Sequence, residues 1–502
     1  MIAVGILRWF FNLQRKEIQL LLAARGTSIS TGEISYLSEE FLLRFYILHR
    51  RHIPQLRELF DNNGGIVLHL DGTGEAGDEI VFSGKEGITG ITIDAQIMPA
   101  ESLKYLKTFL QRFKDTFGKP IAVVRDMSKQ IRDAVNEIFP NVLQLICHYH
   151  FVKNLGKIIF KERYENLRNS IVDTNVLGQL VTLKERLLHD TSSNRLVKVE
   201  RTWTALAIEY LLWPREIASD YPFVLPYFEI ITRGLKLREL INRVVKWNCQ
   251  HNLAVAAIID LSERIDHLTT ASDIQLQYFR IKRIYGWFED TRNVLRIGRN
   301  LSENGQNNEP MDIETVKEDM GNTIDRIENE GREIGGELLS PSREISKQIK
   351  KHWSELFEDV VGRNGKPIKI VRHNGIEERN HRWSRMHTRR RTGRSRTTKD
   401  MAKYGALLSI LSNLENKSYV ENTFNDVKDF VYELQNITAE EIEETRSMIK
   451  PYSYKQIIRS DKKRIELLHE FVDILERSKD NDDKSLESWV LKFKKPNAIL
   501  TP

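Results

Sequence analysis

The sequence feature that most constrains the fold is an apolar run at residues 65–73, GIVLHLDGT, which ends abruptly on Asp71. Glycines bound this run of strand-forming residues on both sides, which is typical of a buried central strand. Residues 121–126, IAVVRD, repeat the pattern and end on Asp126. Open α/β sheets bind ligands at the carboxyl ends of their strands, so this pair of acids predicts a magnesium site. A single Asp at such a place is more often a turn former or a helix N-cap, so the prediction depends on the other motifs that accompany the two acids.

Length and composition set broad limits. The chain has 502 residues, 40% of them hydrophobic, which is enough for two to four domains. A formal charge of +6 is modest for this size, so nucleic-acid binding has to be argued from where the charge lies. Two cysteines, Cys147 and Cys249, exclude a disulfide framework. The apolar start is short and interrupted by Arg8, and no later run could span a membrane, so we expect a soluble, cytoplasmic protein without a membrane partner.

The order of the elements predicts the fold class. Residues 79–83 and 90–98 are expected to form strands, residues 101–117 an amphipathic helix and residues 143–149 a further strand. Three strands in a meander, then a helix, a strand, a helix and a strand, is the order of the ribonuclease H fold. We therefore predict an α/β ribonuclease H-like core with a mixed five-stranded sheet, of which residues 63–153 form the first part. The two acids fall on its first and fourth strands, where that fold holds metal.

The first 62 residues contain two helical patterns. Residues 16–25 have helical spacing and end at Gly26, and Ser30 with Glu33 forms a capping box that opens a second helix. This arrangement predicts a helix-turn-helix-like DNA-binding region over residues 1–62. An ordinary helical hairpin is at least as common and stays open as the alternative. The chain opens directly into this unit, which leaves open whether a further segment precedes it.

Residues 154–368 have almost purely helical character and contain several tryptophans, such as Trp203, Trp213, Trp247 and Trp287. This stretch is too long for a loop and has its own apolar faces, so we predict an all-helical insertion domain. Residues 369–435 are then expected to complete the catalytic core, and residues 436–502 to form a helical tail.

The stretch after residue 369 is densely basic. Its arginines recur at steps of three or four, which places them along one flank of a helix. A solvated basic face is the usual explanation of such a run, but arginine together with tryptophan and histidine favours phosphate binding and base stacking. The predicted DNA-binding residues are Arg379, Arg382, Arg385, Arg389, Arg390, Arg391, Arg394 and Trp383.

Taken together, these motifs resemble a known enzyme family. Asp71 in HLDGT, Asp126 in VVRDMS, the CHYH motif at residues 147–150, a helical insertion, NGIEERN at residues 374–380 and RRRTGR follow one another in this order. This order is similar to that of DDE transposases of prokaryotic insertion sequences of the Mutator-like kind. In that family an all-helical domain splits a ribonuclease H-like core before its last acid. The resemblance covers residues 16–419.

The resemblance implies a catalytic triad. Asp71 and Asp126 match its first two acids, and Glu377 matches the third because Asn374 and Asn380 complete the family pattern N-x-x-E-x-x-N. Glu378 stays open as the alternative, since two adjacent helical residues point about 100° apart and only one of them can face the metal ions.

The family's C-x-x-H motif matches Cys147 and His150, which the resemblance implies shape the surroundings of the active site. One alternative is that Cys147 and His150 form half of a zinc site, which Cys249 and His251 would complete. The other is a buried cysteine beside a hydrogen-bonded histidine.

The implied activity is metal-dependent DNA strand cleavage followed by strand transfer. Three carboxylates would hold two Mg²⁺ or Mn²⁺ ions, water would release a 3′-hydroxyl at the element's end, and that hydroxyl would attack target DNA. The implied partner is double-stranded DNA, at the element ends and the target, bound by a homodimer or larger assembly in the nucleoid without a nucleotide cofactor. Two alternatives stay open: a ribonuclease H-like nuclease or resolvase that cuts without joining, and a catalytically silent DNA-binding relic.

Overall fold

The structure is a computed structural model with two compact units. It describes residues 1–74, 79–189, 193–216, 221–251, 254–297, 312–373, 375–394 and 396–449, without the side chains of residues 216, 376–380 and 447–449. The first unit, called the sheet unit below, combines residues 1–147 with the chain from residue 359 onward. The second, called the helical unit, covers residues 148–358. Each unit is described by itself.

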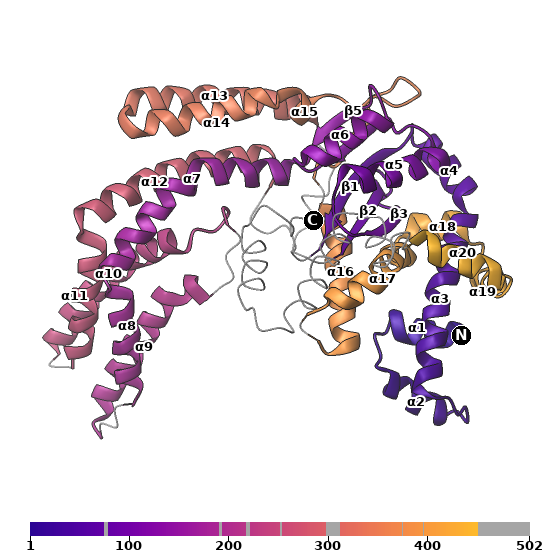
Figure 1. The fold of residues 1–502 in the computed structure, drawn as a ribbon. Helices are drawn as coiled ribbons and strands as arrows, with labels where there is room; N and C mark the ends of the chain where they lie inside the picture. Colours follow the sequence, from indigo (N-terminus) through magenta and orange to yellow (C-terminus); the bar gives the residue numbers. More distant parts are fainter. Residues whose placement is uncertain are drawn as a thin grey trace, which may run out of the picture. The chain divides into compact units, whose positions relative to one another are not determined.

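The sheet unit contains a mixed five-stranded sheet with the order β3-β2-β1-β4-β5 (Figure 1). Strand β2 pairs antiparallel with both β1 and β3, and β4 pairs parallel with β1 and β5. The strands are β1 Val67–Thr73, β2 Ile80–Glu86, β3 Thr92–Met98, β4 Ala122–Arg125 and β5 Leu143–Ile146. The predicted mixed sheet of an α/β core is thereby confirmed, because short apolar runs bounded by turn residues formed strands in the expected order.

One strand prediction was wrong at its end. The strand expected over residues 143–149 stops at Ile146, and helix α7 already begins at His148. Cys147 lies between them, and its backbone N–H donates to the carbonyl oxygen of Arg125 at 2.7 Å. Histidine and tyrosine suit a helix as well as a strand, so the local pattern did not mark this boundary.

Helices cover both faces of the sheet. On one face lie α5 Leu103–Phe117 and α6 Lys129–Ile138, whose apolar residues share a core with Leu68, Leu70 and Phe82. The Phe82 ring meets that of Phe109 edge to face at 5.2 Å. Side chains alternate along a strand, so Asp71 and Thr73 point to the other face. There α16 Gly375–Thr392 contacts β1 and β2, and α17 Thr398–Leu411 contacts β2 and β3 (Figure 1).

The amino-terminal helices are α1 Ile2–Trp9, α2 Arg15–Ala23, α3 Thr31–Arg51 and α4 Ile53–Asn62. The Ser30 side chain accepts a hydrogen bond from the Glu33 N–H at 3.0 Å, which confirms the expected start of α3. From Phe41 onward most of α3 is buried against α17 and the carboxyl-terminal helices. Its first turns are more exposed, and Tyr36 lies there with 61% of its surface exposed.

The remaining elements of the sheet unit follow α17. They are η3 Ser412–Glu415, α18 Lys417–Thr423, α19 Val427–Gln435 and α20 Ala439–Ile449. Helices α19 and α20 pack against α3. The predicted helical tail lies outside the described residues from residue 450 onward.

The helical unit contains only helices among its described residues. They are α7 His148–Asp173, α8 Val176–His189, α9 Arg195–Glu216, α10 Pro226–Gln250, α11 Ala256–Thr270, α12 Ser272–Val294, α13 Ile313–Ile334, η2 Gly336–Leu338, α14 Leu339–Lys351 and α15 Trp353–Phe357. The prediction of helical regions in addition to an α/β core is confirmed. Trp287 is 1% exposed and anchors its core, whereas Trp213 and Trp247 are about half exposed.

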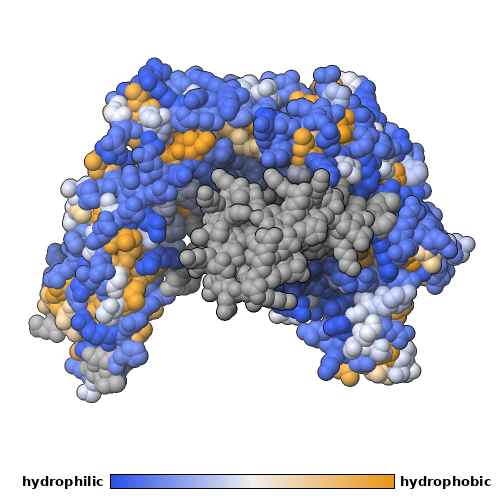
Figure 2. All heavy atoms as spheres, viewed as in Figure 1, coloured by the Kyte–Doolittle hydropathy of each residue, from blue (hydrophilic) through white to orange (hydrophobic). Residues whose placement is uncertain are grey.

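The face of the described residues seen in Figure 2 is mainly hydrophilic, with separate hydrophobic patches. Among the described helices, none is both long and apolar enough to cross a membrane.

Candidate functional site

The two predicted acids lie at matching positions on neighbouring strands. Strand β1 runs parallel to β4, with His69 opposite Val124. Extending this register by two residues places Asp71 opposite Asp126, and adjacent strands are about 4.8 Å apart. Both side chains are partly exposed. The carboxyl ends of β1 and β4 therefore carry two aligned carboxylates, which form the acidic edge of the sheet unit.

Asp126 also forms a turn. Its Oδ1 accepts a hydrogen bond from the Ser128 N–H at 2.8 Å, and Ser128 is the N-cap of α6. The turn-forming role that a lone Asp suggests is thus present. A carboxylate has about four lone-pair sites, so this hydrogen bond leaves capacity for a cation.

A third carboxylate, Glu101, lies near Asp126 and was not predicted from the sequence. The Ser128 hydroxyl donates to its Oε1 at 2.7 Å, and a Cβ added at Gly72 would lie 3.2 Å from its Oε2. Burial raises the pKa of Glu101, the Ser128 hydrogen bond lowers it, and the charge of Asp126 raises it. The residue after Asp71 is Gly72, and its lack of a side chain leaves room for the Glu101 carboxylate. That glycine was the sequence signal for a group approaching the strand end.

Helix α16 brings the segment with the predicted third acid to the same sheet. The Arg385 guanidinium hydrogen-bonds the Thr73 hydroxyl at the end of β1. Glu377 lies two turns earlier in α16, but its side chain is outside the described residues. The same holds for the side chains of Glu378, Arg379 and Asn380, and Asn374 is not described at all.

The basic residues of α16 and the following loop have different surroundings. Arg382, Arg389, Arg390 and Arg394 are exposed, Arg385 is half-buried, and Arg391 is only 2% exposed. The indole N–H of Trp383 donates to Glu415 Oε1 at 2.9 Å, and its ring stacks on that of His387 at 3.9 Å. Trp383 therefore has at most one ring face left for a base.

The C-x-x-H residues fall in different units. Cys147 is buried and ends the first part of the sheet unit, whereas His150 lies in the first turn of α7. Cys249 is exposed near the end of α10. Within the described part of the chain, no three histidine, cysteine, aspartate or glutamate side chains are grouped so that they could hold a metal ion.

The donors at the acidic edge fit a hard cation. Asp71 and Asp126 offer only carboxylate oxygens, the ligands that Mg²⁺ and Mn²⁺ prefer. A third ligand would have to come from the segment of α16 that carries Glu377, whose side chain is outside the described residues.

Comparisons with other proteins add no family assignment. No protein-family model matches the chain, and no curated protein is found to be similar to it.

Proposed function

We propose that this chain is a DDE-type transposase that cleaves DNA at the ends of an insertion sequence and joins those ends to target DNA. The observation that carries the proposal is the parallel pairing of β1 and β4, whose register, continued by two residues, would set Asp71 opposite Asp126. The order β3-β2-β1-β4-β5, with β2 antiparallel, supports a ribonuclease H-like core. Helix α16, with Glu377 near its start, contacts the same strand β1.

The chain's own residues have distinct roles in this proposal. Asp71, Asp126 and Glu377 hold two Mg²⁺ or Mn²⁺ ions, and such ions stabilise charge on the entering and leaving oxygens of a phosphodiester. Arg385, fixed to Thr73 at the end of β1, and the exposed Arg382 hold the DNA strand beside these acids. Glu101 is a positioning residue, because its hydrogen bond to Ser128 ties it to the turn that orients Asp126. The protein acts on DNA in the cytoplasm as at least a dimer.

The test is Mg²⁺-dependent nicking and joining of DNA that carries the ends of the encoding element. Wild type is compared with Asp126→Ala and Glu377→Gln. We expect wild type to cut and join, and both variants to bind DNA but do neither. If Glu377→Gln retains full activity, Glu378→Gln decides whether the neighbouring acid is the third ligand.

The same assay separates the two alternative functions. Cleavage without joined product identifies a nuclease or resolvase. DNA binding without any metal-dependent cleavage identifies a catalytically silent DNA-binding protein.

A further inference from the structure

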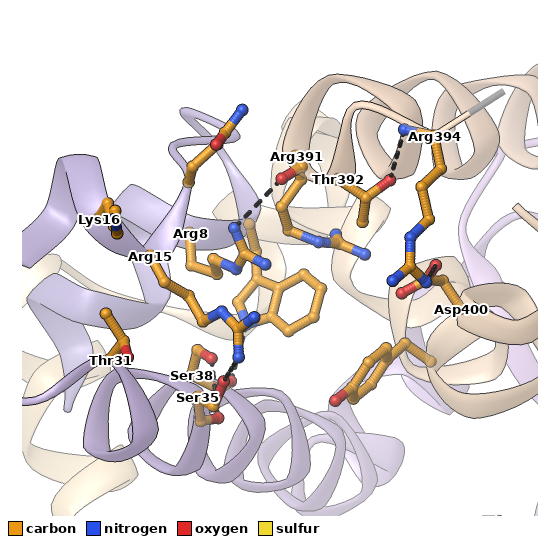
Figure 3. A pocket seen from close by; sticks show the side chains of 13 residues that line it. Arg8, Arg15, Lys16, Thr31, Ser35, Ser38, Arg391, Thr392, Arg394 and Asp400 are labelled. Atoms are coloured by element: carbon orange, nitrogen blue, oxygen red, sulfur yellow. Dashed lines mark hydrogen bonds and ion pairs between the residues drawn. The ribbon is translucent and has the colours of Figure 1, made fainter.

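A basic pocket lies in the sheet unit between two regions that are far apart in the sequence. It has a volume of about 430 Å³, and helices α1, α2 and α3 form one side (Figure 3). The end of α16, the following loop and α17 form the other side. Five of its lining residues are cationic and one, Asp400, is acidic. The cations are Arg8, Arg15, Lys16, Arg391 and Arg394.

Arg391 is the buried anchor of this pocket. Its side chain is 2% exposed, and its guanidinium carbon lies 4.1 Å from the centre of the Trp9 ring. Nη2 is 3.4 Å from the Thr388 hydroxyl, whereas Nη1 has no hydrogen-bond partner among the described residues. A buried guanidinium N–H without an acceptor is costly, so the pocket presents a donor that an anion would satisfy.

The other cations add positive charge to the pocket, which further favours the binding of an anion. Arg8 lies beside Arg391 and donates from Nη1 to the Leu13 carbonyl at 2.7 Å. Arg15 donates to the Ser35 hydroxyl at 3.0 Å (Figure 3). Arg394 is 4.0 Å from Asp400, at the limit of an ion pair. Burial lowers the pKa of Arg391 to about 10, with Arg8 as the next cause, so Arg391 stays charged at pH 7.

The lining favours a phosphate group over a base. Arginine forks bind phosphate oxygens in pairs. One face of the Trp9 ring is covered by Arg391, and Tyr404 packs against that ring at 5.1 Å. The pocket is large enough for a phosphate together with part of a sugar. Its cations would thus contact a nucleic-acid backbone without reading sequence.

We propose that this basic pocket binds a backbone phosphate of DNA, with Arg391 as the anchor and Arg8, Arg15 and Lys16 around it. The choice of DNA as the source of the phosphate rests on the proposed function. The pocket thereby joins the two predicted DNA-binding regions, residues 1–62 and the arginine-rich stretch, in one site.

The primary test changes two exposed cations, because substitution of the buried Arg391 risks unfolding. Arg15→Gln/Lys16→Gln is compared with the matched control Arg195→Gln/Lys198→Gln, which removes one exposed arginine and one exposed lysine of α9, outside the pocket and both predicted DNA-binding regions. Binding of two short labelled duplexes of unrelated sequence to the full chain is measured by fluorescence anisotropy in EDTA at several salt concentrations. Circular dichroism verifies that each variant folds.

We expect the pocket variant to bind both duplexes about tenfold more weakly, and its salt slope to fall by about one for each phosphate that it no longer neutralises. The control should stay within about twofold of wild type. Equal affinity and salt slope in wild type and the pocket variant would overturn the proposal.

A second arm identifies the source of the phosphate. The unfolding temperature is measured in inorganic phosphate and in chloride at equal ionic strength. If phosphate stabilises wild type but not the pocket variant, while both bind the duplexes equally, the ligand is a small phosphate and the DNA proposal is overturned. Because binding is measured in EDTA, a chain that binds through the pocket but never cleaves DNA with Mg²⁺ contradicts the proposed function alone.

Discussion

The middle and the last turn of helix α16 lie beside two sites of opposite charge. Arg385 in its middle contacts Thr73 at the end of β1, two residues from Asp71 of the acidic edge, and its last turn places Arg391 in the basic pocket. Burial acts on both sites in opposite directions: it raises the pKa of Glu101 and lowers that of Arg391. Each site holds like charges that a ligand of the opposite sign would stabilise. Bound metal ions would supply positive charge to the acidic edge, and DNA phosphates would supply negative charge to the basic pocket. We therefore predict that a substitution at one site leaves the function of the other site intact.

The largest effect should come from Asp71→Asn. This change removes a charge from the acidic edge and keeps the size of the side chain. We expect Mg²⁺-dependent cleavage to fall on the order of 10³-fold or more, as for a member of a catalytic unit. Duplex affinity in EDTA should not weaken, because the basic pocket is unchanged.

The matched control is Asp115→Asn, an exposed aspartate at the end of α5, which should cleave like wild type. Loss of duplex binding in Asp71→Asn would show that the two sites are not independent.

Glu101→Gln should have the next largest effect. Glutamine can still accept the Ser128 hydrogen bond but lacks the charge beside Asp126. We expect roughly 10- to 100-fold slower cleavage and a higher Mg²⁺ concentration for half-maximal rate, which is typical of groups that support metal ligands. The metal titration is the decisive measurement, since a purely structural role would lower the rate without moving the Mg²⁺ requirement.

The difference between the two sites also shows what could be predicted from the sequence. Asp71 and Asp126 each end an apolar strand, so local patterns located them and a parallel sheet aligned them. Glu101 was missed because an acid just before a helix is ordinary at that position. Its place beside Gly72 arises only when β2 and β3 fold back along β1.

The basic pocket could not be predicted for a similar reason. Arg391 belongs to a charge run that is typical of an exposed face, yet it is buried under Trp9, which comes from the other end of the chain. Helical spacing describes one helix and carries no information on which distant element will cover it. Histidines at residues 381 and 387 and Thr388 likewise turn out to be buried on α16.

Gly5→Ala should affect the basic pocket more than the acidic edge. A Cβ at this position of α1 would overlap the Phe41 ring of α3. Such overpacking costs about 1–3 kcal/mol in free energy of unfolding. Because α1 carries Arg8 and Trp9, duplex affinity should fall as well. Urea unfolding and anisotropy measure the two effects.

Gly321→Ala in α13 is the control for this change. An added Cβ there meets no atom within 4 Å, so alanine should stabilise the helix by about 0.5–1 kcal/mol. If Gly5→Ala were as stable as wild type, α1 would not be packed closely on α3.

The smallest effect concerns acid stability and the middle of α16. His381 is buried, and neither ring nitrogen has a hydrogen-bond partner among the residues that the structure describes. Burial, followed by the charges of Arg385 and Lys85, lowers the pKa of His381 to about 3. Between this value and about 6.5 the unfolded chain binds a proton that the folded chain does not, so stability falls as pH decreases. From pH 7 to pH 5 the loss should be at most about 2 kcal/mol.

Urea unfolding of wild type and His381→Gln at both pH values measures this contribution. The variant should lose less stability on acidification, whereas the exposed His251→Gln should follow wild type. Other buried histidines, such as His49, titrate equally in all three chains and cancel in the comparison. An unchanged pH dependence in His381→Gln would mean that His381 can be protonated in the folded chain. The middle of α16 would then carry a further positive charge at acidic pH. The positively charged part of the helix would extend from the basic pocket toward β1.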